Sequence, residues 1–294
     1  MAETIELFLM DDSLSGSIRG TVEGRIEVIY KIPRTQIESF KNREDLSNSG
    51  VYFLVGTSNQ SSKDVIYVGQ AGNRKNGGGI LARLLEHKKN PDKNYWTAAI
   101  VLTTKSNDYG ATELNFLENK FYNLAKAANR CEVRNKIDAP LGNIAEGKEH
   151  ALEKSVHYAR LILGALGHKF FEPLAEKVSA QNSADTANTF HLSRKLRNLN
   201  VSVEATARQT AEGFVVLKGS QISGNEDSNI PQIVKNARSE AKLGNENGGV
   251  RVLLEDVLFP NPSRAAMFVI GKSANGFTEW KNASGTLKDF ESNS

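Results

Sequence analysis

Four side chains of types that can act on a phosphate follow one another in the first half of the chain. Tyr52 lies in the stretch GVYFLVG and Tyr67 in VIYVGQAG, with Arg83 and Glu118 further on. Arginine offers a charged, planar fork that suits phosphate oxygens. One glutamate is enough for Mg²⁺, which fills its other positions with water and phosphate oxygens. Tyrosine titrates near pH ~10 when unperturbed, so it needs a nearby cation to act as a base. Together these residue types suit hydrolysis of a phosphodiester bond.

Strands and helices must bring these residues together. Runs rich in β-branched and aromatic residues predict strands at 50–56, 65–69 and 95–104. Apolar residues at helical spacing predict helices at 80–89 and 113–128, the second with Thr112 as its N-cap. Before them, residues 4–10 and 25–32 read as strands separated by the turn-like DDSLSGSIRG. The pattern predicts an α+β domain with two tyrosine-bearing strands at its centre.

In this order, residues 50–135 resemble the catalytic domain of the GIY-YIG nuclease family. Gly50-Val51-Tyr52 matches the first motif and Tyr67-Val68-Gly69 the second, each with Val in place of Ile. The residues at the positions of the family's essential arginine, its metal-binding glutamate and its terminal asparagine are Arg83, Glu118 and Asn135. Five matches in order, on elements of the expected type, make the resemblance specific although each half-motif is weak.

The resemblance implies a small central antiparallel sheet flanked by helices and a metal-dependent endonuclease activity, with DNA favoured over RNA as substrate. Glu118 would hold a single Mg²⁺ or Mn²⁺ ion. Tyr52 would orient or deprotonate the attacking water with Tyr67 beside it, and Arg83 would stabilise the phosphate. The supporting residues would be Gly50, Gly69 and Asn135.

Two further assignments have ordinary alternatives. His87 lies four residues after Arg83, on the same helix face, where it could relay a proton. It could instead simply cap the lysine-rich helix end, near the negative end of the dipole. Glu113 rivals Glu118 as the metal ligand, although an acid in a first helical turn is favoured by the dipole in any case. The family pattern favours Glu118.

Basic residues gather around the predicted helix at 80–89. We expect nucleic-acid contacts from Arg74, Lys75, Lys88 and Lys89, although a solvated helix face would look the same. The run GNRKNGGG lacks the Gly-Lys-Ser/Thr ending of a phosphate-binding loop, so no nucleotide cofactor is expected.

Composition is that of an ordinary globular protein, with 39% hydrophobic and 24% charged residues and a net charge of +3 over 294 residues. Cys131 is the single cysteine, which excludes an internal disulfide framework and a multi-cysteine zinc site. The apolar runs are too short to cross a bilayer, and the acidic N-terminus does not resemble a signal peptide. We therefore expect a cytoplasmic protein without a membrane partner; its oligomeric state is open.

The second half differs in character. We expect an N-terminal strand segment (1–45) packing on the catalytic domain, a nuclease domain with trailing helices (46–178), a small-polar linker (179–189) and a smaller α+β accessory domain (190–294). Residues 213–290 resemble an uncharacterised domain, the 4357 type, that follows GIY-YIG domains in bacterial proteins. In it, Phe277 and Trp280 could stack on a base or form part of the core.

The accessory domain would serve targeting. The alternative functions are a weakly active or inactive nucleic-acid-binding protein on the same scaffold, or an adaptor whose C-terminal domain binds protein. Intact Tyr52, Tyr67, Arg83 and Glu118 favour the enzyme.

Overall fold

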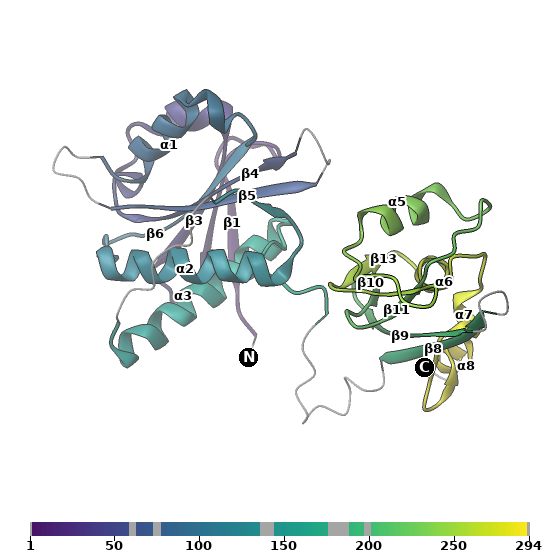
Figure 1. Ribbon diagram of the computed structural model, residues 1–294. Helices are drawn as coiled ribbons and strands as arrows, with labels where there is room; N and C mark the ends of the chain where they lie inside the picture. Colours follow the sequence, from purple (N-terminus) through teal and green to yellow (C-terminus); the bar gives the residue numbers. More distant parts are fainter. Residues whose placement is uncertain are drawn as a thin grey trace. The chain divides into compact units, whose positions relative to one another are not determined.

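The computed structural model describes residues 2–58, 63–72, 78–135, 144–175, 188–196 and 201–292. The chain forms two compact units, Met1–Pro173 and Leu174–Ser294, each of mixed α and β structure (Figure 1). Most of the expected linker lies outside the described residues. None of the helices in the described ranges has both the length and the apolar character needed to cross a lipid bilayer.

The first unit is built on a seven-stranded sheet, counted over the described residues. Every neighbouring pair is antiparallel except β5 and β7, which are parallel. In spatial order the strands are β1 (Ile5–Leu9), β2 (Ile18–Val22), β3 (Glu27–Pro33), β6 (Ala98–Thr104), β4 (Gly50–Thr57), β5 (Asp64–Ala71) and β7 (Glu132–Val133).

The sheet is larger than the small one expected, because the N-terminal segment joins it. Strand β3 pairs with β6 at every position from Glu27 to Pro33. Strands β1–β3 therefore belong to the same sheet as the two tyrosine-bearing strands. Strand β2 was missed in the sequence, where residues 18–20 were read as part of a turn. Its Arg19, Gly20 and Thr21 lack the apolar run typical of a strand, and pairing with both neighbours supplies the strand conformation instead.

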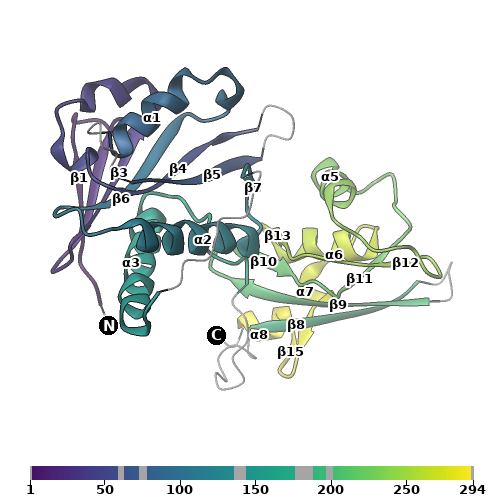
Figure 2. The same ribbon diagram turned by 60° about the vertical axis from the view of Figure 1, so that its left-hand side comes forward.

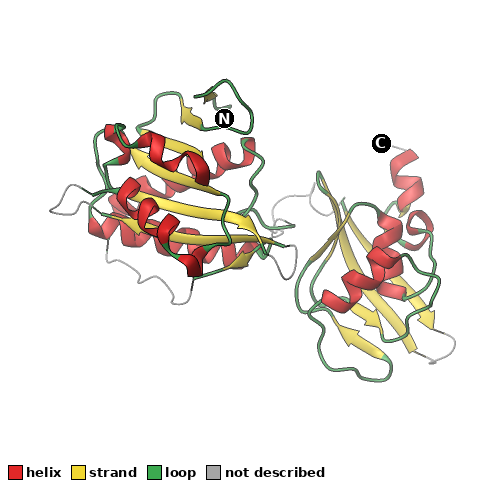
Figure 3. Ribbon diagram, turned by 90° about the horizontal axis from the view of Figure 1, so that it is seen from above, coloured by secondary structure: helices red, strands yellow, loops and turns green. Residues whose placement is uncertain are grey.

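Helices cover both faces of this sheet (Figures 1 and 3). Helix α1 (Ile80–Lys89) lies on one face together with the short 3₁₀ helices η1 (Arg34–Phe40), η2 (Glu44–Leu46) and η3 (Pro91–Lys93). Helices α2 (Ala111–Ala128) and α3 (Glu146–Ala165) cover the other. The N-cap of α2 is Gly110 rather than the expected Thr112, and the helix ends at Asn129 in the left-handed conformation, with φ 50°.

Strand β4 is buried on both sides, which explains its continuous apolar run. Val51, Phe53 and Val55 pack in the core beneath α2 and α3, whereas Tyr52 and Leu54 pack in the core beneath α1. Because side chains alternate along a strand, the first tyrosine must therefore face α1.

Within its described residues, the second unit carries a six-stranded sheet and a separate two-stranded antiparallel sheet (Figure 2). The sheet order is β13 (Val257–Phe259), β10 (Gly213–Val216), β9 (Val201–Thr210), β8 (Thr189–Leu196), β14 (Lys281–Asn282) and β15 (Gly285–Thr286); β11 (Gln221–Ser223) pairs with β12 (Val250–Val252). Its helices are α5 (Gln232–Glu240), α6 (Pro262–Ile270), α7 (Gly276–Glu279) and α8 (Leu287–Ser292). Apolar α6 supplies much of the core.

Candidate active site

The register of β4 and β5 places the two tyrosines on one face of the sheet. Tyr52 lies opposite Gly69, and Tyr67 lies opposite Leu54, two positions along. The two tyrosine rings are 6.3 Å apart between centroids. Both side chains belong to the face covered by α1.

Glycine is needed at position 69 because the Tyr52 side chain crosses it. A Cβ at Gly69 would lie 2.4 Å from the Tyr52 hydroxyl oxygen and 2.9 Å from the Tyr67 ring. A Cβ at Gly50 would lie 2.3 Å from the carbonyl oxygen of Leu102 on β6. The glycines of the two half-motifs thus have separate steric causes, close approach of a side chain and close approach of a backbone.

His87 joins the tyrosines from α1. It is 4% exposed, and its Nε2 lies 2.7 Å from the Tyr52 hydroxyl oxygen. Burial, with the charges of Lys93 and Arg83, lowers the pKa of His87 to about 4, against the partial opposition of Glu86. A neutral imidazole whose ring proton is on Nδ1 can accept a hydrogen bond from the Tyr52 hydroxyl at Nε2. His87 is therefore a buried partner of Tyr52, rather than a simple cap on the exposed end of α1.

The tyrosines themselves stay protonated in this environment. Burial raises the pKa of Tyr52 well above its ordinary value; Tyr67 raises it further, and a hydrogen bond with Arg83 opposes both. Burial also raises the pKa of Tyr67, with Arg83 again acting in the opposite direction. Both phenols are hydrogen-bond donors at neutral pH.

Arg83 lies one turn before His87 on α1, partly exposed. One Nη donates to a Glu86 carboxylate oxygen at 2.7 Å, and the guanidinium also bonds the Tyr52 hydroxyl. Burial lowers the pKa of Arg83, but these two hydrogen bonds outweigh it and the pKa lies above its ordinary value. The Glu86 partner is itself solvent-exposed, so a phosphate could replace it at low cost.

Glu118 reaches the site from α2, the helix on the opposite face. It is partly buried, and its Oε2 accepts a hydrogen bond from Nε2 of Gln70 at 2.8 Å. Its charge raises the pKa of both Tyr52 and Tyr67, and burial is the main cause that raises the pKa of the Glu118 carboxyl. The five groups share one electrostatic environment although they come from both sides of the sheet.

The rival carboxylate has a different neighbourhood. Glu113 lies in the first turn of α2, where one oxygen is 3.4 Å from Nζ of Lys148 on α3. The charge of Glu118 raises the pKa of both tyrosines. This favours Glu118 over Glu113 as the carboxylate that acts together with the tyrosine hydroxyls.

The donor set fits a hard divalent cation with few protein ligands. No group of three or more His, Cys, Asp or Glu side chains in the described part of the chain is placed to hold a metal ion. Glu118 offers one carboxylate, whose Oε2 accepts a hydrogen bond from the Gln70 side chain. Mg²⁺ keeps several waters and often binds through one or two carboxylates plus phosphate oxygens. The residues present therefore fit Mg²⁺ or Mn²⁺ bound jointly by protein and substrate.

Asn135 fixes the strand that carries Tyr67. Its side-chain amide accepts from the Val68 N–H at 3.0 Å and donates to the Val68 carbonyl at 2.7 Å. It continues the parallel pairing of β7 with β5, because the Arg134 N–H donates to the Ile66 carbonyl. Asn135 thus contacts the backbone of the strand that carries Tyr67.

The expected nucleic-acid contacts are only partly described. Arg74 and Lys75 lie outside the described residues. Lys88 forms an ion pair with Glu38 at 3.1 Å, while Lys89 is exposed at the end of α1.

Two site residues were missed in the sequence. Gln70 contacts Glu118, and Lys93 has its Nζ 3.7 Å from the centroid of the Tyr67 ring, a cation–π contact. Strand alternation could have placed Gln70 on the face opposite Tyr67, toward α2. Lys93 was read only as one member of a basic cluster. The Asn90-Pro91 dipeptide before it is a turn signal that could have separated it from α1, since the Asn90 side chain caps η3.

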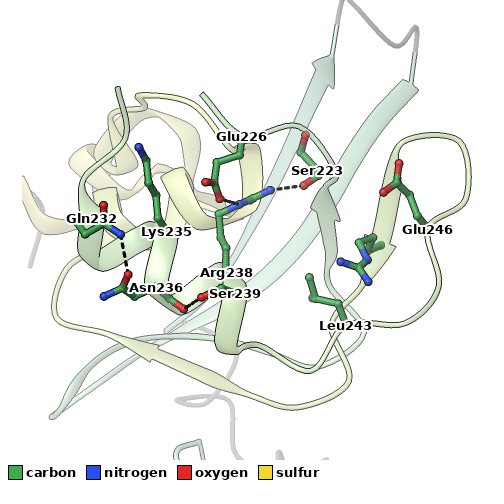
Figure 4. A pocket seen from close by; sticks show the side chains of 11 residues that line it. Ser223, Glu226, Gln232, Lys235, Asn236, Arg238, Ser239, Leu243 and Glu246 are labelled. Carbon is green, nitrogen blue, oxygen red and sulfur yellow. Dashed lines mark hydrogen bonds and ion pairs between the residues drawn. The ribbon is translucent and has the colours of Figure 1, made fainter. Parts of the chain in front are cut away.

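The second unit contains a polar cavity of about 380 Å³ between α5 and the paired strands β11 and β12 (Figure 4). Arg238 fixes its wall, donating to Glu226 at 3.1 Å and to backbone carbonyls of Ser223, Asn225 and Phe268. The cavity is also lined by side chains that carry amide, hydroxyl or charged groups: Gln232, Lys235, Asn236, Ser239, Glu246 and Arg251.

Comparison with known families identifies this unit. Residues 195–291 match the model of a domain of unknown function, DUF4357. The expected C-terminal domain of the 4357 type is thereby confirmed. No curated protein and no solved structure matches the chain. Within the DUF4357 domain, Trp280 is a core residue: it is fully buried and its Nε1 donates to the Pro262 carbonyl at 3.0 Å. Phe277 is 37% exposed and contributes less to the core.

Proposed function

We propose that the first unit is a metal-dependent endonuclease of the GIY-YIG type that hydrolyses phosphodiester bonds in nucleic acid, with DNA preferred over RNA. The observation that carries the proposal is the contact between the Tyr52 hydroxyl and His87 Nε2, made beside Arg83. The Tyr52 phenol and the His87 imidazole are both withdrawn from water, which is costly for stability alone, and the partly exposed Arg83 bonds to the same phenol.

The contact between Tyr52 and His87 offers a path for the proton of the attacking water. With the ring proton of His87 on Nδ1, the Tyr52 hydroxyl donates to Nε2 and its oxygen can still accept from another donor. As the water attacks phosphorus, it passes a proton to the Tyr52 oxygen while Tyr52 passes its own to His87. A direct loss of the Tyr52 proton is disfavoured, because burial raises its pKa.

The cations would act on the phosphate. Arg83 presents its guanidinium at the same hydroxyl and would stabilise charge on the non-bridging oxygens once the phosphate displaces Glu86. A bound Mg²⁺ or Mn²⁺, held by Glu118, would supply further charge neutralisation at the phosphate and the leaving oxygen.

The substrate class follows from chemistry and from position. A site with one carboxylate and one arginine suits a substrate whose phosphate oxygens complete the coordination of the metal ion. Lys88 and Lys89 extend positive charge along α1 beyond Arg83. The DUF4357 domain would direct the nuclease to its target.

The test uses the full chain with supercoiled plasmid, branched and flapped DNA oligonucleotides and a structured RNA, each with and without Mg²⁺ or Mn²⁺. Metal-dependent cleavage that disappears in Glu118→Ala is expected. Glu113→Ala is the matched control, since it removes a carboxylate from the same helix, and it should cleave as the natural protein does. Binding of these substrates without cleavage of any would contradict the proposal and favour a nucleic-acid-binding protein. Cleavage that survives in Glu118→Ala and is lost in Glu113→Ala would mean that Glu113, rather than Glu118, holds the metal ion.

A further inference from the structure

The side chain of Gln70 links the edge of the tyrosine strand to the carboxylate on α2. Its Nε2 lies 2.8 Å from Oε2 of Glu118 and 2.6 Å from Oδ1 of Asn115. Both contacts are within the normal hydrogen-bond range. Asn115 and Glu118 are three residues apart on α2, so they project from neighbouring positions of one helix face.

The chemistry of the groups determines the direction of both bonds. An ionised carboxylate only accepts, so the Gln70 amide must turn its NH₂ group toward Glu118. That group has two protons, and the second goes to Asn115, which must then present its carbonyl oxygen. The donor capacity of the Gln70 amide nitrogen is therefore fully used, and both bonds hold it in one orientation.

The backbone at Gln70 is also fixed. It lies within β5, opposite Val51 of β4, one residue beyond Gly69 and three beyond Tyr67. The Glu118 carboxylate also accepts a hydrogen bond from the Gln70 backbone, so side chain and backbone of one strand residue both contact it. Together these contacts restrict the three rotatable side-chain bonds of the glutamate.

We propose that Gln70 is a positioning residue that orients the Glu118 carboxylate for the divalent cation, with Asn115 holding Gln70 in turn. This inference rests on the proposed function, because it assumes that Glu118 is the metal ligand. Groups of this kind, which hydrogen-bond a ligating carboxylate, typically affect metal affinity by about 10–100-fold when removed.

The measurement is binding of Mn²⁺ to the full chain in the absence of nucleic acid, followed by the fall in the signal of free Mn²⁺ in electron paramagnetic resonance. Gln70→Met keeps the length of the side chain and removes the side-chain amide that donates to Glu118. We expect the Mn²⁺ affinity of this variant to fall by about 10–100-fold. Asn115→Ala, which leaves the Gln70 donor but removes its second anchor, should show a smaller loss. Asn123→Ala is the control, because this exposed residue on α2 donates to Asn119 and should leave the affinity unchanged.

The outcomes separate this inference from the proposed function. If Glu118→Ala loses Mn²⁺ binding while Gln70→Met and Asn115→Ala bind as the natural protein does, the positioning role is overturned and the metal ligand stands. If Glu118→Ala binds Mn²⁺ unchanged, the metal assignment itself fails, and this inference fails with it. Thermal unfolding of each variant shows whether a loss of affinity reflects a loss of fold, and the Asn115 variant tests the chain of contacts independently of β5.

Discussion

The Tyr52 hydroxyl oxygen lies 2.7 Å from Nε2 of His87, and the two side chains are only 1% and 4% exposed. The bond connects β4 to α1 across the core of that face. Burial keeps the phenol protonated and the imidazole neutral, so with the ring proton of His87 on Nδ1 the hydrogen bond runs from Tyr52 to Nε2. In that tautomer the same contact fixes the helix on the sheet and gives a proton a path from Tyr52 to His87.

Replacing the Tyr52 hydroxyl should separate these roles. Tyr52→Phe keeps the ring in its buried position and removes the proton path, so cleavage is expected to fall by about 10²–10⁴-fold. Plasmid cleavage at saturating metal measures this. Tyr30→Phe is the matched control: it removes another buried hydroxyl, bonded to Arg43 at 2.8 Å and to Asp45. That variant should lose about 1–2 kcal/mol of stability while cleaving normally. Equal cleavage by both variants would refute the proton path.

The steric requirement at Gly69 predicts a loss of activity from one methyl group. Gly69→Ala would place a Cβ 2.4 Å from the Tyr52 hydroxyl oxygen, so the hydroxyl must move away from His87. We expect cleavage to fall by at least 10²-fold, because a misplaced catalytic group is costly. Gly72→Ala, whose Cβ would meet Leu114 at an ordinary 3.7 Å, should be close to natural activity. If the Gly69 variant cleaves as well as the Gly72 variant, the site tolerates displacement and the assignment of Tyr52 is wrong.

Burial of His87 predicts a pH dependence of stability. Its pKa is lowered from 6.5 to about 4, mainly by burial and by the charges of Lys93 and Arg83. Between these two values the unfolded chain binds a proton that the folded chain does not. The free energy of unfolding should therefore rise with pH across this window and lose up to about 3 kcal/mol as the pH falls through it. Urea unfolding from pH 4.5 to 7.5 measures the slope; His87→Gln, which does not titrate, should flatten it. An unchanged slope in that variant would show that His87 is solvated.

Asn135 provides a test of the strand that carries Tyr67. Asn135→Leu leaves the buried Val68 N–H and carbonyl without their partner, which should lower the free energy of unfolding by about 1–3 kcal/mol. Asn135→Asp retains the acceptor and loses the donor. Its free energy of unfolding should therefore lie between that of the natural protein and that of Asn135→Leu. Urea denaturation gives both values. Leucine and aspartate variants as stable as the natural protein would mean that solvent replaces the amide.

Local patterns were enough to predict the elements that position the site. Ile80, Leu81 and Leu84 repeat with helical spacing, and α1 spans the predicted residues 80–89. The tyrosine strands were also found, because each is an apolar run bounded by turn residues. These signals are local, since they depend on which side chains the chain itself must bury.

Long-range relationships were not predictable in the same way. Strand β7 has two residues, too few for any periodicity, and yet it directs Asn135 to Val68. The contact of Gln70 with Glu118 joins residues 48 positions apart, and nothing in either local pattern pairs them. The extent of the sheet was missed for a related reason: β3 acquires its neighbour β6 only through tertiary pairing.

That pairing of β3 with β6 also has a consequence for the order in which the chain is made. The ribosome completes β3 at Pro33 and does not begin β6 until Ala98. At about 5–20 residues per second this interval lasts about 3–13 s. During that time Val28, Tyr30 and Ile32, which are buried in the finished sheet, lack the neighbours that cover them. We expect stalled nascent chains that end before residue 98 to be cleaved readily by protease and those that extend past α3 to resist. Strand β3 would thus be synthesised several seconds before the strand with which it pairs.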